Sequence, residues 1–244
     1  MNNEQNIDEL LKHWPFDPFA INVRMLELRQ RHVLQMRVDM GVLQLETEGR
    51  PDGMTPHGAS TYYDFLKAKS IEDSGFALDE QNCLEIDREF VQFYHRRVCW
   101  LQLKEFNNAV ADADHTLGLM DFCKRFSSDD EWTRNHEQYR PFVIYHRTQA
   151  ASLAHLEGED EIDTERAIQE VNDGLERLRS LFVEYDAEEQ FEEDELVVRL
   201  IEFREGVRER YEIGLTIREQ LDKAVEDEDY EKAAELRDQL DSRS

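Results

Sequence analysis

The hydrophobic positions of this chain change their period once. Over residues 21–28 and 33–46 they recur in part at every second position, which is typical of strands with one buried face. We therefore expect a small antiparallel sheet near the N-terminus. Gly41 interrupts the longer run and indicates either a bulge or a turn between two short strands. Turn-forming residues gather over 48–58, so we place the edge of this β-containing region, residues 1–55, at that loop.

From Ser60 onward the apolar residues recur at intervals of three and four, and only Pro141 and scattered glycines interrupt them. This period predicts amphipathic helices almost to the end of the chain. The expected fold class is therefore mainly α, with a helical body over residues 56–190 that follows the small sheet.

Two stretches of the helical body resemble each other. Tyr94-His95 and Tyr145-His146 open them, and each is followed by a second helix with small and large apolar residues at matching places: Phe106, Ala109, Ala113 and Leu117, then Ala167, Val171, Gly174 and Leu175. The alignment needs an acidic insertion over 158–164, which we interpret as a longer loop between helices. We interpret the pair of stretches as an internal repeat.

The order of large and small apolar residues in these stretches resembles tetratricopeptide repeats, over about half of the chain. That resemblance implies a helical scaffold that binds peptides. Arg96 and Arg97 stand where the family usually has a Leu-Gly pair, and the period exceeds the usual ~34 residues. Helical hairpins outside any named family are the alternative.

An acidic segment separates the helical body from the C-terminal part. Residues 183–195 contain eight acids and no base, so mutual repulsion predicts a loop or a frayed connection there. Beyond it, over 191–244, an apolar spacing of three and four runs from Leu196 to Val225. It predicts one long helix, alone or paired with another, before the end of the chain.

The last residues have the pattern of a helical hairpin. Two short amphipathic stretches meet at an acidic turn, where Asp227 or Asp229 can cap the second helix. Some twenty-four residues cannot bury their apolar side chains alone, so we expect a protein partner here. The positions that we predict for partner contact or for the hairpin core are Leu221, Ala224, Val225, Tyr230, Ala233, Ala234, Leu236, Arg237 and Leu240.

The same segment closely resembles the UVR (UvrB/UvrC) motif, through Leu221-x-x-Ala-Val-x-x-Glu-Asp-Tyr-Glu-Lys-Ala-Ala-Glu-Leu-Arg-Asp238. That family occurs in subunits of the bacterial excision nuclease, and in adaptors and regulators linked to Clp proteases and protein arginine kinases. The resemblance implies contacts with another protein or with a second copy of the chain, as in a homodimer. The N-terminal stretches 14–18 and 34–41 are similar to uncharacterised bacterial proteins with the same terminal motif. This similarity does not indicate any particular activity.

Charge and composition exclude several classes of function. The net charge of −27 and the pI near 4.6 repel phosphate backbones, so direct nucleic-acid binding is not expected. We interpret the short basic pairs Arg96-Arg97 and Lys124-Arg125 as solvated helix faces. Three cysteines without a CxxC pair favour a reducing compartment. The polar, acidic N-terminus and the lack of a long apolar run predict a cytoplasmic protein without a membrane role.

The sequence offers two weak candidates for chemistry. His95 with Cys99, and Asp112 with His115, have spacings that place two metal ligands on one helix face, but such pairs arise easily by chance and a packing role is favoured. Arg50, Asp52 and His57 form a polar cluster in the turn-rich loop. No nucleotide-binding, hydrolase or metalloprotease motif occurs in the sequence. We expect no catalytic residue, metal ion or cofactor.

The leading hypothesis is therefore a non-enzymatic adaptor that docks partners through its C-terminal hairpin. An accessory factor of nucleotide excision repair is a narrower form of this hypothesis. The rival is a metal-binding enzyme built around His95, Cys99 and His115.

Overall fold

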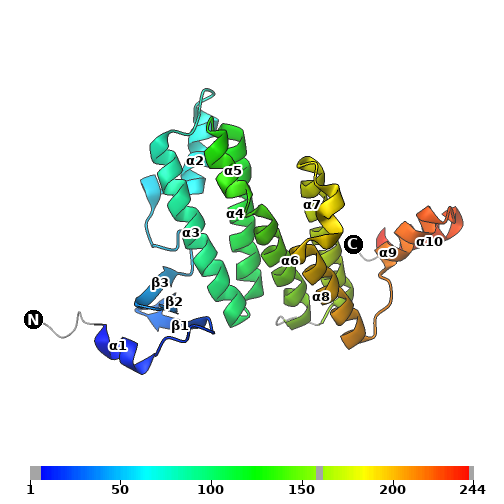
Figure 1. Cartoon of the computed structure of the whole chain (residues 1–244), viewed down its shortest axis with the longest axis horizontal. Helices are drawn as coiled ribbons and strands as arrows, with labels where there is room; N and C mark the ends of the chain where they lie inside the picture. Colours follow the sequence, from blue (N-terminus) through cyan, green and yellow to red (C-terminus); the bar gives the residue numbers. More distant parts are fainter. Residues whose placement is uncertain (1–6, 158–161, 242–244) are drawn as a thin grey trace, which may run out of the picture. The chain divides into compact units, whose positions relative to one another are not determined.

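The structure is a computed structural model that describes residues 7–157 and 162–241. The described chain is mainly helical, with one antiparallel sheet near its start and a pair of short helices near its end (Figure 1). The predicted fold class is thus confirmed. The chain divides into two compact units, Met1–Ala150 and Ala151–Ser244, and the division falls inside helix α6 (Arg140–Glu157).

The elements follow one another in a simple order. The first unit contains α1 (Asp8–His13), β1 (Asn22–Leu28), β2 (Arg31–Val38), β3 (Gly41–Glu46), the 3-10 helix η2 (Pro56–Gly58), α2 (Tyr62–Glu72), α3 (Glu80–Leu103), α4 (Phe106–Phe126), α5 (Asp130–Glu137) and the start of α6. The second contains the end of α6, then α7 (Thr164–Glu184), the 3-10 helix η3 (Glu188–Glu193), α8 (Glu195–Tyr211), α9 (Ile217–Glu226) and α10 (Tyr230–Asp241).

The sheet is an antiparallel meander in the order β1-β2-β3. Arg29 and Gln30, which connect β1 and β2, have φ values of 50° and 69°, and two positive values in a row are what a type I′ hairpin turn needs. Leu34, in the central strand, is fully buried. Gly41 is the first residue of β3 and pairs with Val38. The structure therefore has a turn there, and not a bulge.

Aromatic and aliphatic side chains from α2, α3 and α4, and from the loop before α3, form the main core of the first unit. Thr61 and Asp79 start α2 and α3 because their side chains accept hydrogen bonds from backbone N–H groups of the first turn. The core side chains are Tyr62, Leu66, Phe76, Leu78, Ile86, Leu119, Phe122 and Cys123.

The interpretation of Arg96-Arg97 as a solvated helix face is wrong. Arg96 is 5% exposed and Arg97 is 2% exposed. The Arg96 guanidinium donates to both carboxylate oxygens of Asp112, with Nη2–Oδ1 at 2.7 Å and Nε–Oδ2 at 2.9 Å. Its Nη1 donates to the carbonyls of Glu46 and Gly49. One buried cation thus joins α3 to α4 and to the segment that follows the sheet. Sequence periodicity could not predict this, because the partners come from two other segments.

The second basic pair behaves as expected. Lys124 and Arg125 are exposed at the end of α4. There the positive charges also interact favourably with the negative end of the helix dipole.

Glu89, in the middle of α3, is a fully buried carboxylate with four partners. It accepts hydrogen bonds from the backbone N–H groups of Tyr62 at 2.7 Å and Tyr63 at 3.0 Å. A side chain of another helix thus satisfies two backbone donors in the first turn of α2. His115 Nε2 lies 3.0 Å from its Oε1, and Arg50 Nε lies 3.7 Å from its Oε2. Burial of a carboxylate is tolerated only when its oxygens are paired in this way. Glu89 therefore fixes where α2, α4 and the loop after the sheet meet α3.

In the second unit, α7 packs against α8, and the end of α6 adds Leu156 to an apolar cluster with Ala167, Ile168 and Val207. The acidic segment 183–195 is a loop only in part, since it contains η3. Phe191 in η3 is 4% exposed, and its ring lies 5.5 Å from that of Phe182.

The prediction of one long helix from Leu196 to Val225 is wrong. Helix α8 ends at Tyr211, and Glu212 adopts the left-handed conformation with φ of 53°. A new helix begins at Ile217 after a connection that contains Gly214. The apolar spacing continues across this break because both helices turn apolar side chains inward, so the spacing alone did not reveal the end of α8.

Helices do form where the internal repeat was predicted, with the first copy on α3 and α4 and the second on α6 and α7. The predicted insertion at 158–164 lies partly outside the described residues, which stop at 157 and resume at 162. The likeness to tetratricopeptide repeats and the boundaries near residues 55 and 190 stay predictions. Of the described helices, none has both the length and the apolar character needed to cross a bilayer.

We expect Glu89→Gln to lower the free energy of unfolding of the first unit by about 2–4 kcal/mol. The Gln amide NH₂ would face helix N–H donors or the Arg50 guanidinium, where the carboxylate accepted hydrogen bonds. Urea denaturation followed by circular dichroism measures the change. The control is Glu80→Gln, in the first turn of α3, where the side chain is exposed and a loss below about 1 kcal/mol is expected. Equal losses in both variants would contradict the role given to Glu89.

Candidate functional site

The C-terminal hairpin begins with a reciprocal cap on α9. Glu219 N–H donates to Thr216 Oγ1 at 3.2 Å, and Thr216 N–H donates to Glu219 Oε2 at 2.7 Å. This is the capping box that the spacing Thr-x-x-Glu favours. It explains why α9 starts at Ile217 and is separate from α8.

The acidic turn between the two helices is fixed by its backbone. Glu228 adopts a left-handed conformation with φ of 57°, and Asp229 N–H donates to the Ala224 carbonyl at 2.8 Å, which closes the last turn of α9. The side chain of Asp229 accepts from Lys232 N–H at 3.2 Å. Of the two predicted caps, Asp229 is therefore the one that caps α10.

The hairpin has a small apolar core of its own. Its buried members are Ile217, Ala224, Ala233 and Leu236, and Leu221 and Leu240 pack against them half-buried. Each helix contributes one alanine to this core, and such small side chains allow the helices to approach closely. Ile217 was missing from the predicted set, although it lies one helical turn before Leu221.

The structure divides the predicted contact positions into two groups. Leu221, Ala224, Ala233, Leu236 and Leu240 belong to the hairpin core. The other four predicted positions, Val225, Tyr230, Ala234 and Arg237, are exposed. Tyr230 is 69% exposed and Val225 is 48% exposed. The sequence pattern placed both groups on one side of each helix, and only the packing separates them.

Within the second unit, Glu219 also connects the hairpin to the helices before it. Asn172 Nδ2 of α7 donates to Glu219 Oε1 at 3.0 Å, and Arg208 of α8 forms an ion pair with the same oxygen. Partial burial acts to raise the pKa of Glu219, but the hydrogen bonds from Thr216 and Asn172 and the charge of Arg208 outweigh it, so the pKa is lowered. The carboxylate thus holds the start of α9 at three places.

Helices α9 and α10, with their capping box and acidic turn, form the helical hairpin that the sequence predicted. Residues 216–242 match the family model described as the UvrB/uvrC motif, UVR. Comparison with curated proteins and with solved structures found no match. The UVR match covers the hairpin and leaves the rest of the chain without an assigned relative.

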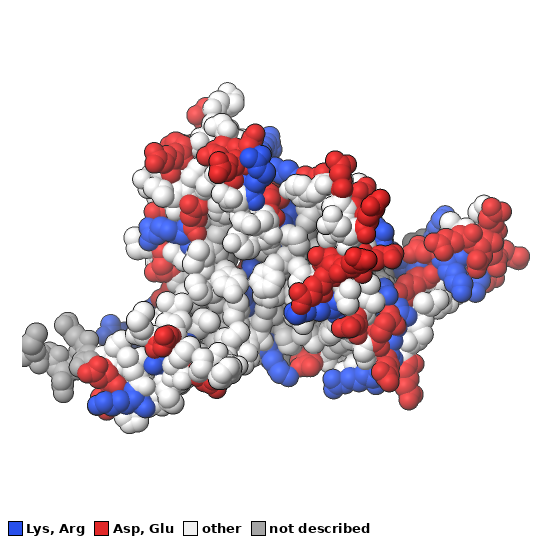
Figure 2. Space-filling model, viewed as in Figure 1, with Lys and Arg blue, Asp and Glu red and all other residues white. Residues whose placement is uncertain are grey.

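The surroundings of the UVR hairpin are strongly acidic. Figure 2 shows acidic side chains crowded over α9 and α10, with a few lysine and arginine side chains beside them. The four exposed positions, Val225, Tyr230, Ala234 and Arg237, are together called the docking face, after the role proposed for them. They combine an aromatic ring, small apolar side chains and one cation.

The polar cluster predicted in the loop after the sheet comes together only in part. Arg50 is buried, and its Nη2 donates to Glu85 Oε2 at 2.8 Å while its Nε lies 3.4 Å from Asp52 Oδ2. His57 instead stacks on Phe65, with ring centroids 4.1 Å apart. Arg50 therefore serves the packing of the loop on α3.

Two of the four candidate metal ligands, Asp112 and His115, are engaged with other side chains, while the ring of His95 meets that of its neighbour Tyr94 edge-on. Asp112 holds Arg96, and His115 stacks on Phe93 with ring centroids 3.7 Å apart while it contacts Glu89. Burial raises the pKa of the Cys99 thiol to about 12. In the described part of the chain, no three His, Cys, Asp or Glu side chains are placed together to hold a metal ion.

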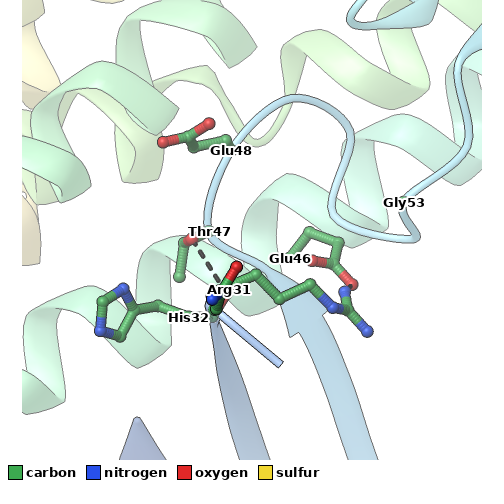
Figure 3. A pocket seen from close by; sticks show the side chains of 7 residues that line it. Arg31, His32, Glu46, Thr47, Glu48 and Gly53 are labelled. Carbon is green, nitrogen blue, oxygen red and sulfur yellow. Dashed lines mark hydrogen bonds and ion pairs between the residues drawn. The ribbon is translucent and has the colours of Figure 1, made fainter. Parts of the chain in front are cut away.

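A polar hollow of about 450 Å³ lies beside the end of the sheet, between the β1–β2 turn and the loop that follows β3. Figure 3 shows Arg31 reaching Glu46 across it, with which it forms an ion pair, while His32 and Glu48 point away from that pair. Thr47 Oγ1 donates to the His32 carbonyl at 3.1 Å. Within this hollow, Arg31 and Glu46 therefore satisfy each other's charge.

We expect Glu219→Gln to destabilise the UVR hairpin at pH 7 by about 1 kcal/mol, because the capping hydrogen bonds and the ion pair with Arg208 both weaken. Amide hydrogen exchange of α9 and α10 measures this loss. Since the pKa of Glu219 is lower in the folded chain, its contribution is complete above the unfolded pKa, near 4.5, and is lost as the pH falls through the folded value.

Glu235→Gln, at an exposed position of α10, is the control and should leave exchange in the hairpin unchanged. The wild-type hairpin should lose its advantage over Glu219→Gln when the amide hydrogen exchange of the two proteins is compared well below pH 4. A constant difference between the two proteins from pH 7 down to that pH would contradict the assignment.

Proposed function

We propose that the chain is a non-catalytic adaptor that binds another protein through the docking face of its UVR hairpin. The single observation that carries the proposal is the division of the UVR positions. After the hairpin has buried its own core, Val225, Tyr230, Ala234 and Arg237 still point to solvent. The hairpin core accounts for Ala233 and Leu236 but gives no reason for an aromatic side chain and an arginine outside it.

The spacing of these residues favours a single contact surface. Tyr230, Ala234 and Arg237 lie four and three positions apart, so they share one side of α10. Tyrosine and arginine are the side chains that most often dominate the energy of protein interfaces, and an alanine between them permits close approach of a partner helix. Val225 lies near the end of α9, close to the turn, and is a further exposed apolar side chain of the motif.

The charge around the docking face favours a different protein over a second copy of this chain. Acidic side chains crowd the face of the hairpin that Figure 2 shows, and the whole chain carries a net charge of −27. Two copies would bring acidic surfaces together, which opposes association, whereas a partner with basic residues around an apolar centre would be attracted. We therefore propose a heterologous partner with such a rim.

A second candidate is an accessory factor of nucleotide excision repair. It is favoured by the family description alone, since the motif at 216–242 is the one named after the UvrB and UvrC subunits. In this candidate the partner of the docking face is a subunit of the repair nuclease. A deletion strain that is more sensitive to ultraviolet light would support it, and normal sensitivity would favour an adaptor in another pathway.

We expect Tyr230→Ser combined with Arg237→Glu in the full-length chain to lower the amount of co-purified partner at least tenfold. The two side chains supply the aromatic anchor and the only cation of the docking face, and neither belongs to the hairpin core. Affinity capture from an extract of the source organism, with quantitative mass spectrometry of one and the same captured protein, measures the effect. Circular dichroism should show unchanged helix content.

The control is Tyr185→Ser, which removes a half-exposed tyrosine from the end of α7 in the same unit. It should leave capture at the wild-type level. If wild type captures no protein specifically, or if the double variant captures as much as wild type, the proposed docking face is wrong. A wild-type dimer that the double variant dissociates, seen by light scattering, would replace the heterologous partner by a second copy.

A further inference from the structure

Arg97 is a buried cation without an anion. Its side chain is 2% exposed, and among the described residues its Nη1 donates to Thr116 Oγ1 at 3.1 Å while its Nε has no acceptor. The neighbouring Arg96 already occupies both carboxylate oxygens of Asp112. Burial lowers the pKa of Arg97 to about 10, in spite of the opposing charge of Asp112. The guanidinium is still charged at pH 7, and an unpaired charge at this depth is costly to the fold.

This cation lines a largely apolar pocket of the first unit. The pocket has a volume of about 790 Å³ and lies between α3, α4, α5 and the start of α6. Arg97 and Thr116 contribute polar groups from α3 and α4, and the apolar wall includes Phe90, Met120, Trp132 and Phe142. Further polar lining comes from Asp87, Asn135, His136 and Gln138. A volume of this size is typical of sites for small organic molecules, in which an apolar wall surrounds a few polar groups.

The other ionisable groups of the pocket do not neutralise Arg97. Asp87 accepts a hydrogen bond from Trp132 Nε1 at 2.9 Å and lies 3.0 Å from His136 Nε2. His136 in turn stacks on Phe90, with ring centroids 4.5 Å apart. His146, on α6, has its pKa lowered to about 4, first by burial and then by the charge of Arg97, so it is neutral at pH 7. The positive charge of Arg97 is therefore available to a bound anion.

We propose that this pocket binds a small organic carboxylate with an aromatic or alkyl body, whose carboxylate pairs with Arg97 and whose body lies against Phe90, Trp132 and Phe142. A planar guanidinium is suited to a carboxylate because it offers parallel N–H donors. The aromatic wall supplies the burial that holds the rest of the molecule. The site lies wholly in the first unit, so it is independent of the docking face.

The test compares two probes of nearly equal shape on the full-length wild-type protein. Isothermal titration with 4-phenylbutyrate and with 4-phenylbutyramide measures the affinity for a charged and an uncharged head group on the same body. We expect one site per chain and at least tenfold tighter binding of the carboxylate. Equal affinities, or no binding of the carboxylate at millimolar concentration, would overturn the proposal.

Arg97→Met tests the role of the guanidinium itself. Methionine fills much of the same space without the charge, so the variant should lose the preference for the carboxylate over the amide. Because it also removes an unpaired buried charge, its midpoint of thermal unfolding should be higher than that of wild type. The matched control is Arg134→Met, which removes an exposed arginine from α5 beside the pocket and should retain the preference.

Arg97→Lys keeps the positive charge, and it is the alternative test of the guanidinium if the methionine variant does not fold. It should weaken 4-phenylbutyrate binding by several-fold and retain part of the preference. A folded Arg97→Met that still prefers the carboxylate would show that another group binds the anion. A peptide ending in phenylalanine that binds at least tenfold more tightly than 4-phenylbutyrate would assign the pocket to a protein C-terminus instead of a small molecule.

Discussion

The first unit depends on a carboxylate that the core cannot leave unpaired. Glu89 lies at the centre of α3 with its oxygens turned to the start of α2, to His115 and to Arg50. A group of this kind costs free energy unless every contact is in place, so it specifies one arrangement of the loop and three helices. Arg96 and Asp112 do the same two turns further along α3 and hold the end of the sheet. Arg97, next in the chain, is the one member of this charged series that the described residues leave without an ion pair.

In the second unit, a carboxylate at the surface also binds groups from several helices. Glu219 caps its own helix and at the same time binds Asn172 and Arg208 of the preceding helices. The hairpin would otherwise depend on a core of four buried side chains, which is small for an independent fold. Because caps and the acidic turn stabilise the hairpin, it can leave Tyr230 and Arg237 in solvent. The hairpin therefore uses one set of residues of the motif for its own stability, and we propose that the exposed set binds the partner.

Much of this could be predicted from the sequence, and the failures have a common cause. Local signals identified the strands, most of the helices, the acidic turn and the UVR motif, because each depends on residues close together in the chain. The burial of Glu89, Arg96 and Arg97 could not be predicted, since their partners come from α2, α4 and the loop after the sheet. The break after Tyr211 was missed although Gly214 and the Thr216-x-x-Glu219 spacing both mark it. The division of the UVR positions into core and docking face required the packing of α9 on α10.

The proposed adaptor function requires that the docking face of the UVR hairpin is where this chain meets its partner. Hydrogen–deuterium exchange of the full-length chain, alone and in complex with the protein that it captures, tests this claim most directly. On binding, amide exchange should become slower in the last turn of α9 and along α10, and it should stay unchanged in α3 and α4. Protection confined to the first unit, with the hairpin exchanging as it does in the free chain, would contradict the proposal.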